Sequence, residues 1–285
     1  MNIVDAQIHL GPGGISETLA AMDALGIAAA LLDEYWVEGF SGKPYHALPN
    51  GALRPVCPTA ELAAQQYPNR FSWLLRIHRL DTESAAIVRQ VRDAPNGRAL
   101  RIDPGLSPEE LERFAVGGYD HILAAASDAG LPIFVFAPDS PDAFARAARA
   151  FPDCRIVIDH CGLYSNSMRS SFARRKTLDE AGQGDLFARV MELSAFPNLH
   201  LKWGHASAMF DTPAWPGIGL RAPLRQALCA FGARRVMWAS DFSVNQRGES
   251  WAELLFGPLS DPGLSEDEKA AFFGGALREL LDWPV

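Results

Sequence analysis

The chain has 285 residues, 48% of them hydrophobic, and a formal net charge of −8. This length and apolar content suffice for a large buried core, while the negative charge argues against a surface for nucleic acid or anionic membranes. No apolar run approaches the length of a membrane-spanning helix, so composition favours a globular protein.

The start of the chain and its cysteines bear on the compartment. An apolar strand begins at Ile3, so we expect no secretory signal peptide before it. The cysteines are scattered, without the paired spacing of a metal site: Cys57, Cys154, Cys161 and Cys229. We interpret them as reduced thiols and expect a cytoplasmic protein. Because no repeat or linker divides the chain, we expect a single domain over residues 1–285.

The N-terminal half alternates apolar strands with helices. In chain order we predict a strand at 3–9, a helix at 16–25, a strand at 27–32, a helix at 59–67, a strand at 71–77, a helix from 81 or 82 to 91, and a strand at 99–102. Residues 39–58 are rich in Gly and Pro and lack periodicity. We predict a long loop there, of a kind that is often functional.

The C-terminal half continues the alternation. We predict helices at 108–114 and 120–129, a strand at 132–137, a helix from 140 or 142 to 151, strands at 155–159 and 199–203 around a helix at 185–195, a helix at 220–231, a strand at 235–240 and a helix at 265–281. Residues 164–184 are predicted to be irregular. Ser265 and Glu268 have the spacing of a capping box at the start of the last helix.

Eight apolar strands that alternate with helices predict an α/β fold of the (β/α)8 TIM-barrel type. Most of the strands are hydrophobic nearly throughout, as expected when both faces of a sheet are covered. An open doubly wound sheet is the alternative, and it would want a Gly-rich phosphate loop after the first strand. Gly11-Pro12-Gly13-Gly14 lacks that spacing, and its proline removes an N–H donor.

Three polar side chains share one face of the first predicted strand. Side chains two residues apart point the same way, so Asp5, Gln7 and His9 lie together. Buried polar groups are costly unless hydrogen bonds or a function use them. We interpret this face as the first wall of an active site, with a hydrogen-bonded core cluster as the alternative.

In a barrel of this type the active site lies at the carboxyl ends of the strands. The polar residues at these ends are Gln7, His9, Asp33, Glu34, Arg76, His78, Arg101, Asp103, His160, Lys202, His205 and Asp241. The amino ends of the strands show no comparable set of imidazoles. This asymmetry predicts an enzyme. Arg76 and Arg101 are candidates to grip a substrate carboxylate, with ion pairing to Asp103 or Asp33 as the alternative.

Three motifs resemble the amidohydrolase superfamily. Residues 3–9 resemble its Asp-x-His-x-His signature, residues 156–162 its strand-six histidine, and residues 237–242 its strand-eight aspartate. The resemblance spans nearly the whole chain and is closest to the branch with pyrone-dicarboxylate and sugar-acid lactonases and some decarboxylases. It implies hydrolysis of a small carboxylated lactone or related ester by water attack. A non-oxidative decarboxylase, or a degenerate barrel that only binds a ligand, are the alternatives.

The chain departs from this family in its ligand set. The first signature histidine is Gln7, and strand four carries Arg101 without a lysine to form a bridging carbamate. We therefore expect at most one divalent metal such as zinc, held by His9, His160 and Asp241, with Gln7 as a candidate oxygen ligand; a metal-free site is the alternative. Asp241 would act as general base, with a raised pKa if no metal is bound. His160 would either polarise the substrate carbonyl or stabilise the tetrahedral oxyanion.

The remaining predictions concern the substrate and partners. We expect substrate contacts from Gln7, Arg76, Arg101, Lys202 and His205. Tyr35, Trp36 and Tyr164 are candidates for an apolar wall, and ordinary packing explains them equally well. The expected partner is a small, carboxylated molecule; nucleic acid and membrane are not expected, and a homodimer is left open.

Overall fold

The computed structural model describes residues 1–10, 13–33, 45–55, 58–242 and 248–284. Eight parallel strands form one sheet in the order β1-β2-β5-β6-β7-β8-β9-β10. They are β1 (Ile3–Ile8), β2 (Ile27–Leu32), β5 (Phe71–Arg76), β6 (Gly97–Ile102), β7 (Ile133–Val135), β8 (Ile156–Ile158), β9 (Leu199–Trp203) and β10 (Val236–Trp238). A parallel bridge from Ile8 to Phe242 joins the two ends of the sheet. The predicted (β/α)8 barrel is confirmed.

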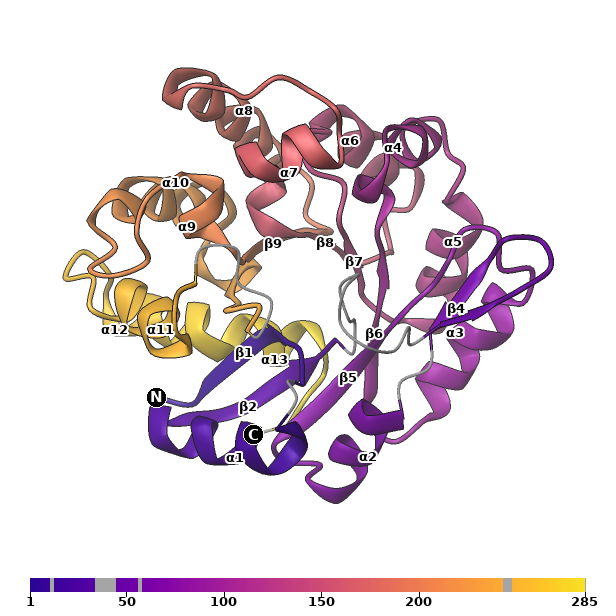
Figure 1. Ribbon diagram of the computed structural model, residues 1–285, viewed down its shortest axis with the longest axis horizontal. Coiled ribbons are helices and arrows are strands. Elements are labelled where there is room, and N and C mark those ends of the chain that lie inside the picture. Colours follow the sequence, from indigo (N-terminus) through magenta and orange to yellow (C-terminus); the bar gives the residue numbers. More distant parts are fainter. Residues whose placement is uncertain (11–12, 34–44, 56–57, 243–247, 285) are drawn as a thin grey trace.

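Helices surround this barrel on its outer side (Figure 1). They are α1 (Gly14–Leu25), α2 (Pro58–Gln66), α3 (Ser84–Asp93), α4 (Pro108–Ala115), α5 (Asp120–Ala129), α6 (Pro141–Ala150), α7 (Asn166–Ser171), α8 (Glu180–Glu192), α9 (Ala206–Met209), α10 (Arg221–Phe231), α11 (Trp251–Leu259), α12 (Glu266–Ala270) and α13 (Ala276–Leu280). Among the described residues, none of these helices has the length and hydropathy that a membrane crossing requires.

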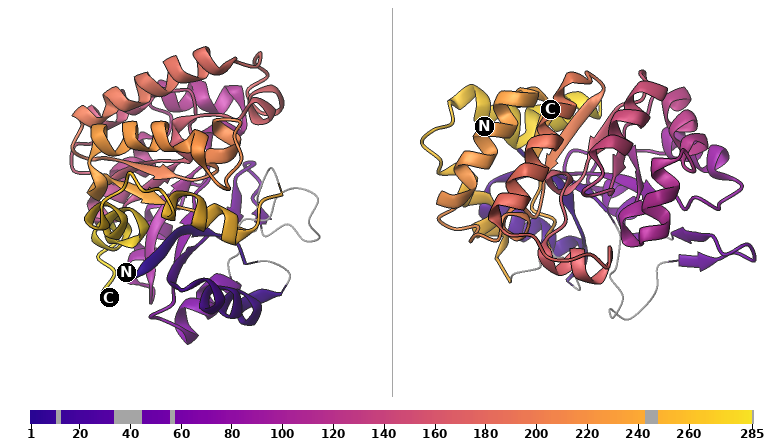
Figure 2. Two further views of the ribbon diagram at one scale, coloured as in Figure 1. Left: turned by 90° about the vertical axis from the view of Figure 1, so that its left-hand side faces the viewer. Right: turned by 90° about the horizontal axis from the view of Figure 1, so that it is seen from above.

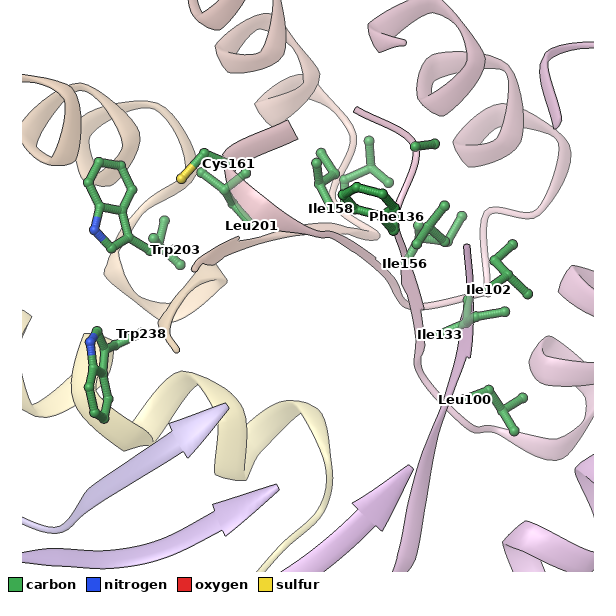
Figure 3. Packing of buried hydrophobic residues seen from close by; sticks show 14 of the residues in the cluster. Leu100, Ile102, Ile133, Phe136, Ile156, Ile158, Cys161, Leu201, Trp203 and Trp238 are labelled. Carbon is green, nitrogen blue, oxygen red and sulfur yellow. The ribbon is translucent and has the colours of Figure 1, made fainter. Parts of the chain in front are cut away.

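The outer face of the strands packs against the helices. Leu100, Ile102 and Ile133 point from β6 and β7 toward the surrounding helices (Figure 3). They belong to one buried cluster with Phe114 of α4 and Phe144 of α6. Burial of such side chains stabilises the fold by about 1.5–3 kcal/mol each, so this layer holds the barrel wall in place.

The inner face of the same strands changes character along its length. Side chains alternate along a strand, so the residues between the outward ones face the interior. Ala99 and Val157 are buried there in a second cluster. Two residues further along, the same face carries Arg101 and Asp159, both buried. The interior is therefore apolar toward the amino ends of the strands and charged at their carboxyl ends.

The two chain ends lie close together (Figure 2). The Arg278 guanidinium donates to the Asn2 side-chain oxygen at 3.0 Å. Asn2 precedes β1, so both ends are at the amino ends of the strands, away from the charged mouth.

The predicted loop at 39–58 contains a small antiparallel hairpin. β3 (Tyr45–Ala47) pairs with β4 (Leu53–Pro55), with Tyr45 opposite Pro55. The prediction of a loop throughout this stretch is therefore wrong. Residues 39–44 and 56–57, and the candidates Glu34, Tyr35 and Trp36, lie outside the described residues.

Residues 164–184, predicted to be irregular, contain α7 and the start of α8. The Ser165 side chain accepts from the Met168 N–H at 3.2 Å, and the Asp179 side chain accepts from the Gly182 N–H at 2.9 Å. These side chains cap the two helices, because each satisfies an N–H that has no partner within its helix. Capping therefore starts both helices where hydrophobic periodicity gives no signal.

The C-terminal region holds one unpredicted helix and one predicted capping box. α11 begins at a capping box of Ser250 and Glu253 and contains Pro258, which lacks the N–H of a regular helical residue. The box of Ser265 and Glu268 is confirmed. The predicted helix at 265–281 is divided, because a wider turn at 271–275 separates α12 from α13. At Gly274 in this turn a Cβ would lie 2.5 Å from the Asn2 carbonyl oxygen.

Candidate active site

Three residues at the mouth adopt a backbone conformation that L residues rarely take. His160, His205 and Asp241 follow β8, β9 and β10 and have φ of 48°, 51° and 57°. The left-handed region costs a non-glycine residue about 1–2 kcal/mol, and such positions cluster at functional sites. Each turn ends the strand and brings its side chain to a shared centre.

The centre of this site is the Asp241 carboxylate. Its Oδ1 accepts from Gln7 Nε2 at 2.6 Å and lies 2.7 Å from His9 Nε2. Its Oδ2 lies 2.7 Å from His205 Nε2 and 3.6 Å from His160 Nε2. All five side chains are buried. The structure thus brings together Gln7, His9, His160 and Asp241 as predicted, and adds His205 to them.

The environment sets the protonation state of this group. Burial raises the pKa of Asp241, but the neighbouring His205 and His9 lower it further, so the pKa lies well below its usual range. The raised pKa predicted for a metal-free base is therefore wrong in direction. Burial, Lys202 and His205 together hold the pKa of His160 well below its usual value. Near neutral pH an ionised carboxylate thus lies beside a neutral imidazole.

Lys202 fixes the orientation of the Gln7 amide. The buried ammonium donates to Gln7 Oε1 and lies 2.6 Å from Asp159 Oδ1. Because a lysine ammonium only donates, Gln7 Oε1 faces Lys202 and Gln7 Nε2 faces Asp241. Gln7 is therefore a donor at the centre, which corrects its prediction as an oxygen ligand for a metal.

Arg76 is held by two carboxylates. Its Nε and Nη2 donate to the two oxygens of Asp33 at 2.8 and 2.5 Å, and its Nη1 donates to Asp103 at 2.5 Å. The ion pairing considered as an alternative in the sequence analysis is therefore present.

Arg101 is held in the same way by three carboxylates. Its Nη1 donates to Asp33 at 2.7 Å, its Nε donates to Asp103 at 2.9 Å, and its Nη2 lies 2.9 Å from Asp159. Burial raises the pKa of Asp33, yet Arg76 and Arg101 outweigh it and lower that pKa far below its usual range. The arginine clamp expected for a substrate carboxylate is thus already filled by protein carboxylates.

These pairs fix the charge balance of the described part of the mouth. The positive charges of Arg76, Arg101 and Lys202 are matched by Asp33, Asp103 and Asp159. Asp241 is not part of these ion pairs, and its described partners are the amide of Gln7 and the imidazoles of His9, His160 and His205. A carboxylate placed among imidazoles is suited to bind a cation or to accept a proton.

A cavity of about 310 Å³ opens over this centre, a volume typical of small-molecule sites. Its polar lining consists of Gln7, His9, Arg76, Arg101, Asp103, His160, Ser167, Ser171, His205 and Asp241, of which the two serines belong to α7. Its apolar side is lined by Leu106, Phe136, Met168 and Phe172. Lys202 lies beneath the lining, so it acts on Gln7 and not at the surface where its substrate contact was predicted. A larger cavity of about 590 Å³ beside α8 and α10 contains none of the predicted site residues.

One group of side chains fits a single divalent metal. Among the described residues, ligand atoms of His160, His205 and Asp241 all lie within 4.8 Å of one another. Two imidazoles and an ionised carboxylate are a donor set that zinc takes, with a position left for water. His9, the predicted ligand, is not in this group, because its Nε2 approaches the other oxygen of Asp241.

Three residues from the sequence analysis have structural contacts instead. Asp5 accepts from the Ser240 N–H at 3.0 Å and from Trp251 Nε1 at 2.9 Å, which ties β1 to the end of the sheet. The Tyr164 hydroxyl donates to the Gly105 carbonyl, so ordinary packing explains this residue. His78 does not line the cavity, and its Nδ1 accepts from the Leu80 N–H at 3.2 Å.

Sequence reasoning missed two features of the site. Asp159 was not proposed as a site residue, although it is two residues beyond the inward-facing Val157. That alternation is the signal that could have found it. The apolar side of the cavity was also missed, because it is assembled from a turn, a strand end and α7 and has no common sequence pattern.

A family model described as Amidohydrolase matches residues 56–283. No curated protein matches the chain by sequence. An amidohydrolase structure from Burkholderia multivorans with bound HEPES is similar over 100% of both chains, at 18% identity and a TM-score of 0.74. A second structure from the same organism, with bound zinc, is similar over 100% of both chains at 18% identity and a TM-score of 0.72. A probable 2-pyrone-4,6-dicarboxylic acid hydrolase from Acinetobacter baumannii, with citric acid bound, covers 99% of this chain and 100% of its own at 14% identity and a TM-score of 0.67.

These structures share the fold with this chain, and their low identities carry no more than that. The family match is of a different kind, because it is made by sequence and covers most of the barrel, including His160, His205 and Asp241. This match agrees with the prediction of an enzyme, which was drawn from the polar residues at the mouth of the barrel. The chain therefore belongs to the amidohydrolase family.

Proposed function

We propose that this protein hydrolyses a small lactone or related ester by water attack, with Asp241 as the general base. The observation that carries the proposal is the ionised Asp241 carboxylate in the cavity, with the imidazoles of His9, His160 and His205 around it. The choice of a lactone or ester is supported by the fold shared with a protein named as a probable 2-pyrone-4,6-dicarboxylic acid hydrolase.

In the proposed reaction a water oxygen forms a bond to the substrate carbonyl carbon. Asp241 takes a proton from that water, and the ester C–O bond breaks as the leaving oxygen receives the proton. His160 lines the same cavity and, in our proposal, stabilises the oxygen that becomes negative during the attack. His9 and Gln7 hold Asp241 Oδ1, which leaves Oδ2 on the side of His160 and His205.

His160, His205 and Asp241 are the residues that would hold a single divalent metal. Such an ion lowers the pKa of water and polarises a carbonyl, two contributions that a carboxylate with a lowered pKa does not supply by itself. In this proposal His9 is not a metal ligand, and it holds Asp241 Oδ1 instead.

The carboxylate expected on the substrate is not part of this proposal. It was expected to bind Arg76 or Arg101, and both guanidiniums are committed to Asp33 and Asp103. A decarboxylase is the second candidate, because the fold is also shared with a 5-carboxyvanillate decarboxylase from Sphingomonas paucimobilis, but the carboxylate of such a substrate would meet the same committed guanidiniums. The test below separates that reaction from hydrolysis.

The test is turnover of a panel of lactones and aryl esters in water enriched in ¹⁸O. Hydrolysis predicts one ¹⁸O in the acid product and no release of CO₂. Asp241→Asn should lose this turnover. Asp142→Asn is its matched control, because Asp142 is an exposed residue of α6. Release of CO₂ from a carboxylated member would favour the decarboxylase, and binding without turnover would favour the ligand-binding alternative.

A further inference from the structure

The apolar side of the cavity comes from three separate elements. Leu106 ends the short turn after β6, and Phe136 directly follows β7. Met168 lies in α7, and Phe172 follows this helix. All four line the same cavity as Asp241. We call these four residues the apolar wall.

Contacts behind the apolar wall hold it in shape. The Phe136 ring meets the His160 ring edge to face at 5.3 Å and the Tyr164 ring at 6.0 Å between centroids. Tyr164 is itself fixed to the turn after β6 through the Gly105 carbonyl. A surface that is held in this way loses little freedom when a ligand binds.

Helix α7 is anchored from two sides. The Ser165 side chain caps its first turn. The Arg169 guanidinium lies 2.5 Å from Asp139, and both side chains are buried. Met168 and Phe172 are therefore presented to the cavity by an anchored helix.

The described charges around the cavity disfavour a carboxylate on the substrate. Among the described residues, Arg76, Arg101 and Lys202 are each paired with protein carboxylates, and Asp241 adds a further carboxylate to the lining. A substrate carboxylate would have to break one of these buried pairs, and a buried carboxylate left unpaired is costly. An apolar group meets no such cost at the apolar wall, where Leu106 remains 41% exposed.

We propose that the group beyond the reacting carbonyl of the substrate is uncharged and apolar, and that it lies against Leu106, Phe136, Met168 and Phe172. This inference rests on the proposed function, which places the carbonyl beside Asp241. It makes the apolar wall the part of the site that determines specificity.

Three cyclic ketones test this inference, because a ketone has no leaving oxygen and cannot be hydrolysed. Their dissociation constants are measured with the full-length protein by calorimetry: cyclopentanone, 2-pentylcyclopentanone and 3-oxocyclopentane-1-carboxylate. We expect the pentyl ketone to bind about tenfold or more tightly than cyclopentanone, since each buried methylene favours binding. The carboxylate should bind more weakly than cyclopentanone.

Variants locate the binding surface. Phe136→Ala and Met168→Ala should remove most of the gain from the pentyl group, whereas Leu62→Ala, at an exposed leucine of α2, should keep it. Leu106→Lys keeps the test open if the core variants fail to fold, because it changes an exposed residue. It should weaken binding of the pentyl ketone and strengthen binding of the carboxylate.

Two results would overturn the inference: a pentyl ketone that binds no more tightly than cyclopentanone, or a carboxylate that binds more tightly than either. Failure of the proposed function gives a different pattern. If the pentyl ketone binds tightly and no lactone or ester is hydrolysed, the apolar subsite stands and the reaction must be another one.

Discussion

At the scale of single residues, the site depends on which imidazole accompanies Asp241. Residue types after the strands predicted a His/His/Asp centre with His9 and His160, whereas the structure groups His205 with His160 and Asp241. That choice is made by left-handed turns after β9 and β10, which rotate His205 toward Asp241 Oδ2. Such turns leave no pattern in a sequence, because histidine and aspartate are not residues that require them.

The assignment of His205 over His9 can be tested by zinc titration of the purified protein. We expect one zinc per chain in the wild type. Loss of a direct ligand in His205→Ala should weaken zinc binding by more than about 100-fold, whereas loss of an outer contact in His9→Ala should cost about 10–100-fold or less. A larger loss in His9→Ala than in His205→Ala would return His9 to the ligand set.

Lys202 should matter for stability as well as for the orientation of Gln7. Lys202→Met leaves Asp159 buried, with Arg101 as its remaining ion-pair partner in the part of the chain that the structure describes. Breaking a buried pair from one side costs about 3–5 kcal/mol, so we expect a loss near 3 kcal/mol in urea unfolding. Lys202→Met combined with Asp159→Asn should recover part of it. A loss below about 1 kcal/mol in the single variant would contradict this account of the pair.

At the scale of elements, the strands were predictable and some of the helices were not. The strand at 27–32 has the predicted bounds, because it is apolar on both faces and ends at Asp33. The strand at 199–203 also has them, because Leu199, Leu201 and Trp203 alternate along it and Gly204 follows it. Helices α7 and α11 escaped prediction because side-chain caps start them and Pro258 interrupts the pattern in α11. Hydrophobic periodicity therefore finds the barrel but not the helix that carries part of the apolar wall.

The cap of α7 gives a prediction at this scale. Ser165→Ala should lower the free energy of unfolding by about 1 kcal/mol, the usual effect of losing such a cap. Because α7 carries Met168, it should also weaken binding of 2-pentylcyclopentanone. Ser265→Ala removes the corresponding cap of α12, at a helix that contributes nothing to the described cavity lining. It should cost similar stability without changing ketone affinity, and an equal change in affinity would contradict a link between α7 and the apolar wall.

At the scale of the whole molecule, the barrel brings charges from several strands into one network. Asp33 after β2 joins Arg76 of β5 to Arg101 of β6. The sequence placed these residues at one mouth, since the topology of the barrel was predictable. Their pairing was left as an alternative, because the reach of each side chain depends on the register between neighbouring strands.

This network predicts how stability depends on pH. Asp33 has a pKa far below its usual value in the folded chain, while in the unfolded chain its pKa is about 3.9. As the pH falls below about 4 the unfolded chain binds the proton first, so the stabilisation by Asp33 is present above that pH and is lost below it. We expect Asp33→Asn to cost about 3 kcal/mol at pH 7, and the gap to wild type should narrow toward pH 3. Urea unfolding at pH 7 and pH 3 measures the difference in unfolding free energy between the variant and the wild type. A difference that widens toward pH 3 would contradict the ion pairing of Asp33.

The central claim is that Asp241 accepts the proton of the attacking water in a hydrolytic reaction. The measurement that tests it most directly is kcat of Asp241→Asn on the best lactone or ester, with Asp142→Asn as the control and circular dichroism to show that both are folded. The amide keeps the size of the side chain but cannot take the proton, so kcat should fall by about 10²–10⁴-fold or more, while the control stays near wild type. A folded Asp241→Asn protein that retains wild-type kcat would contradict the claim.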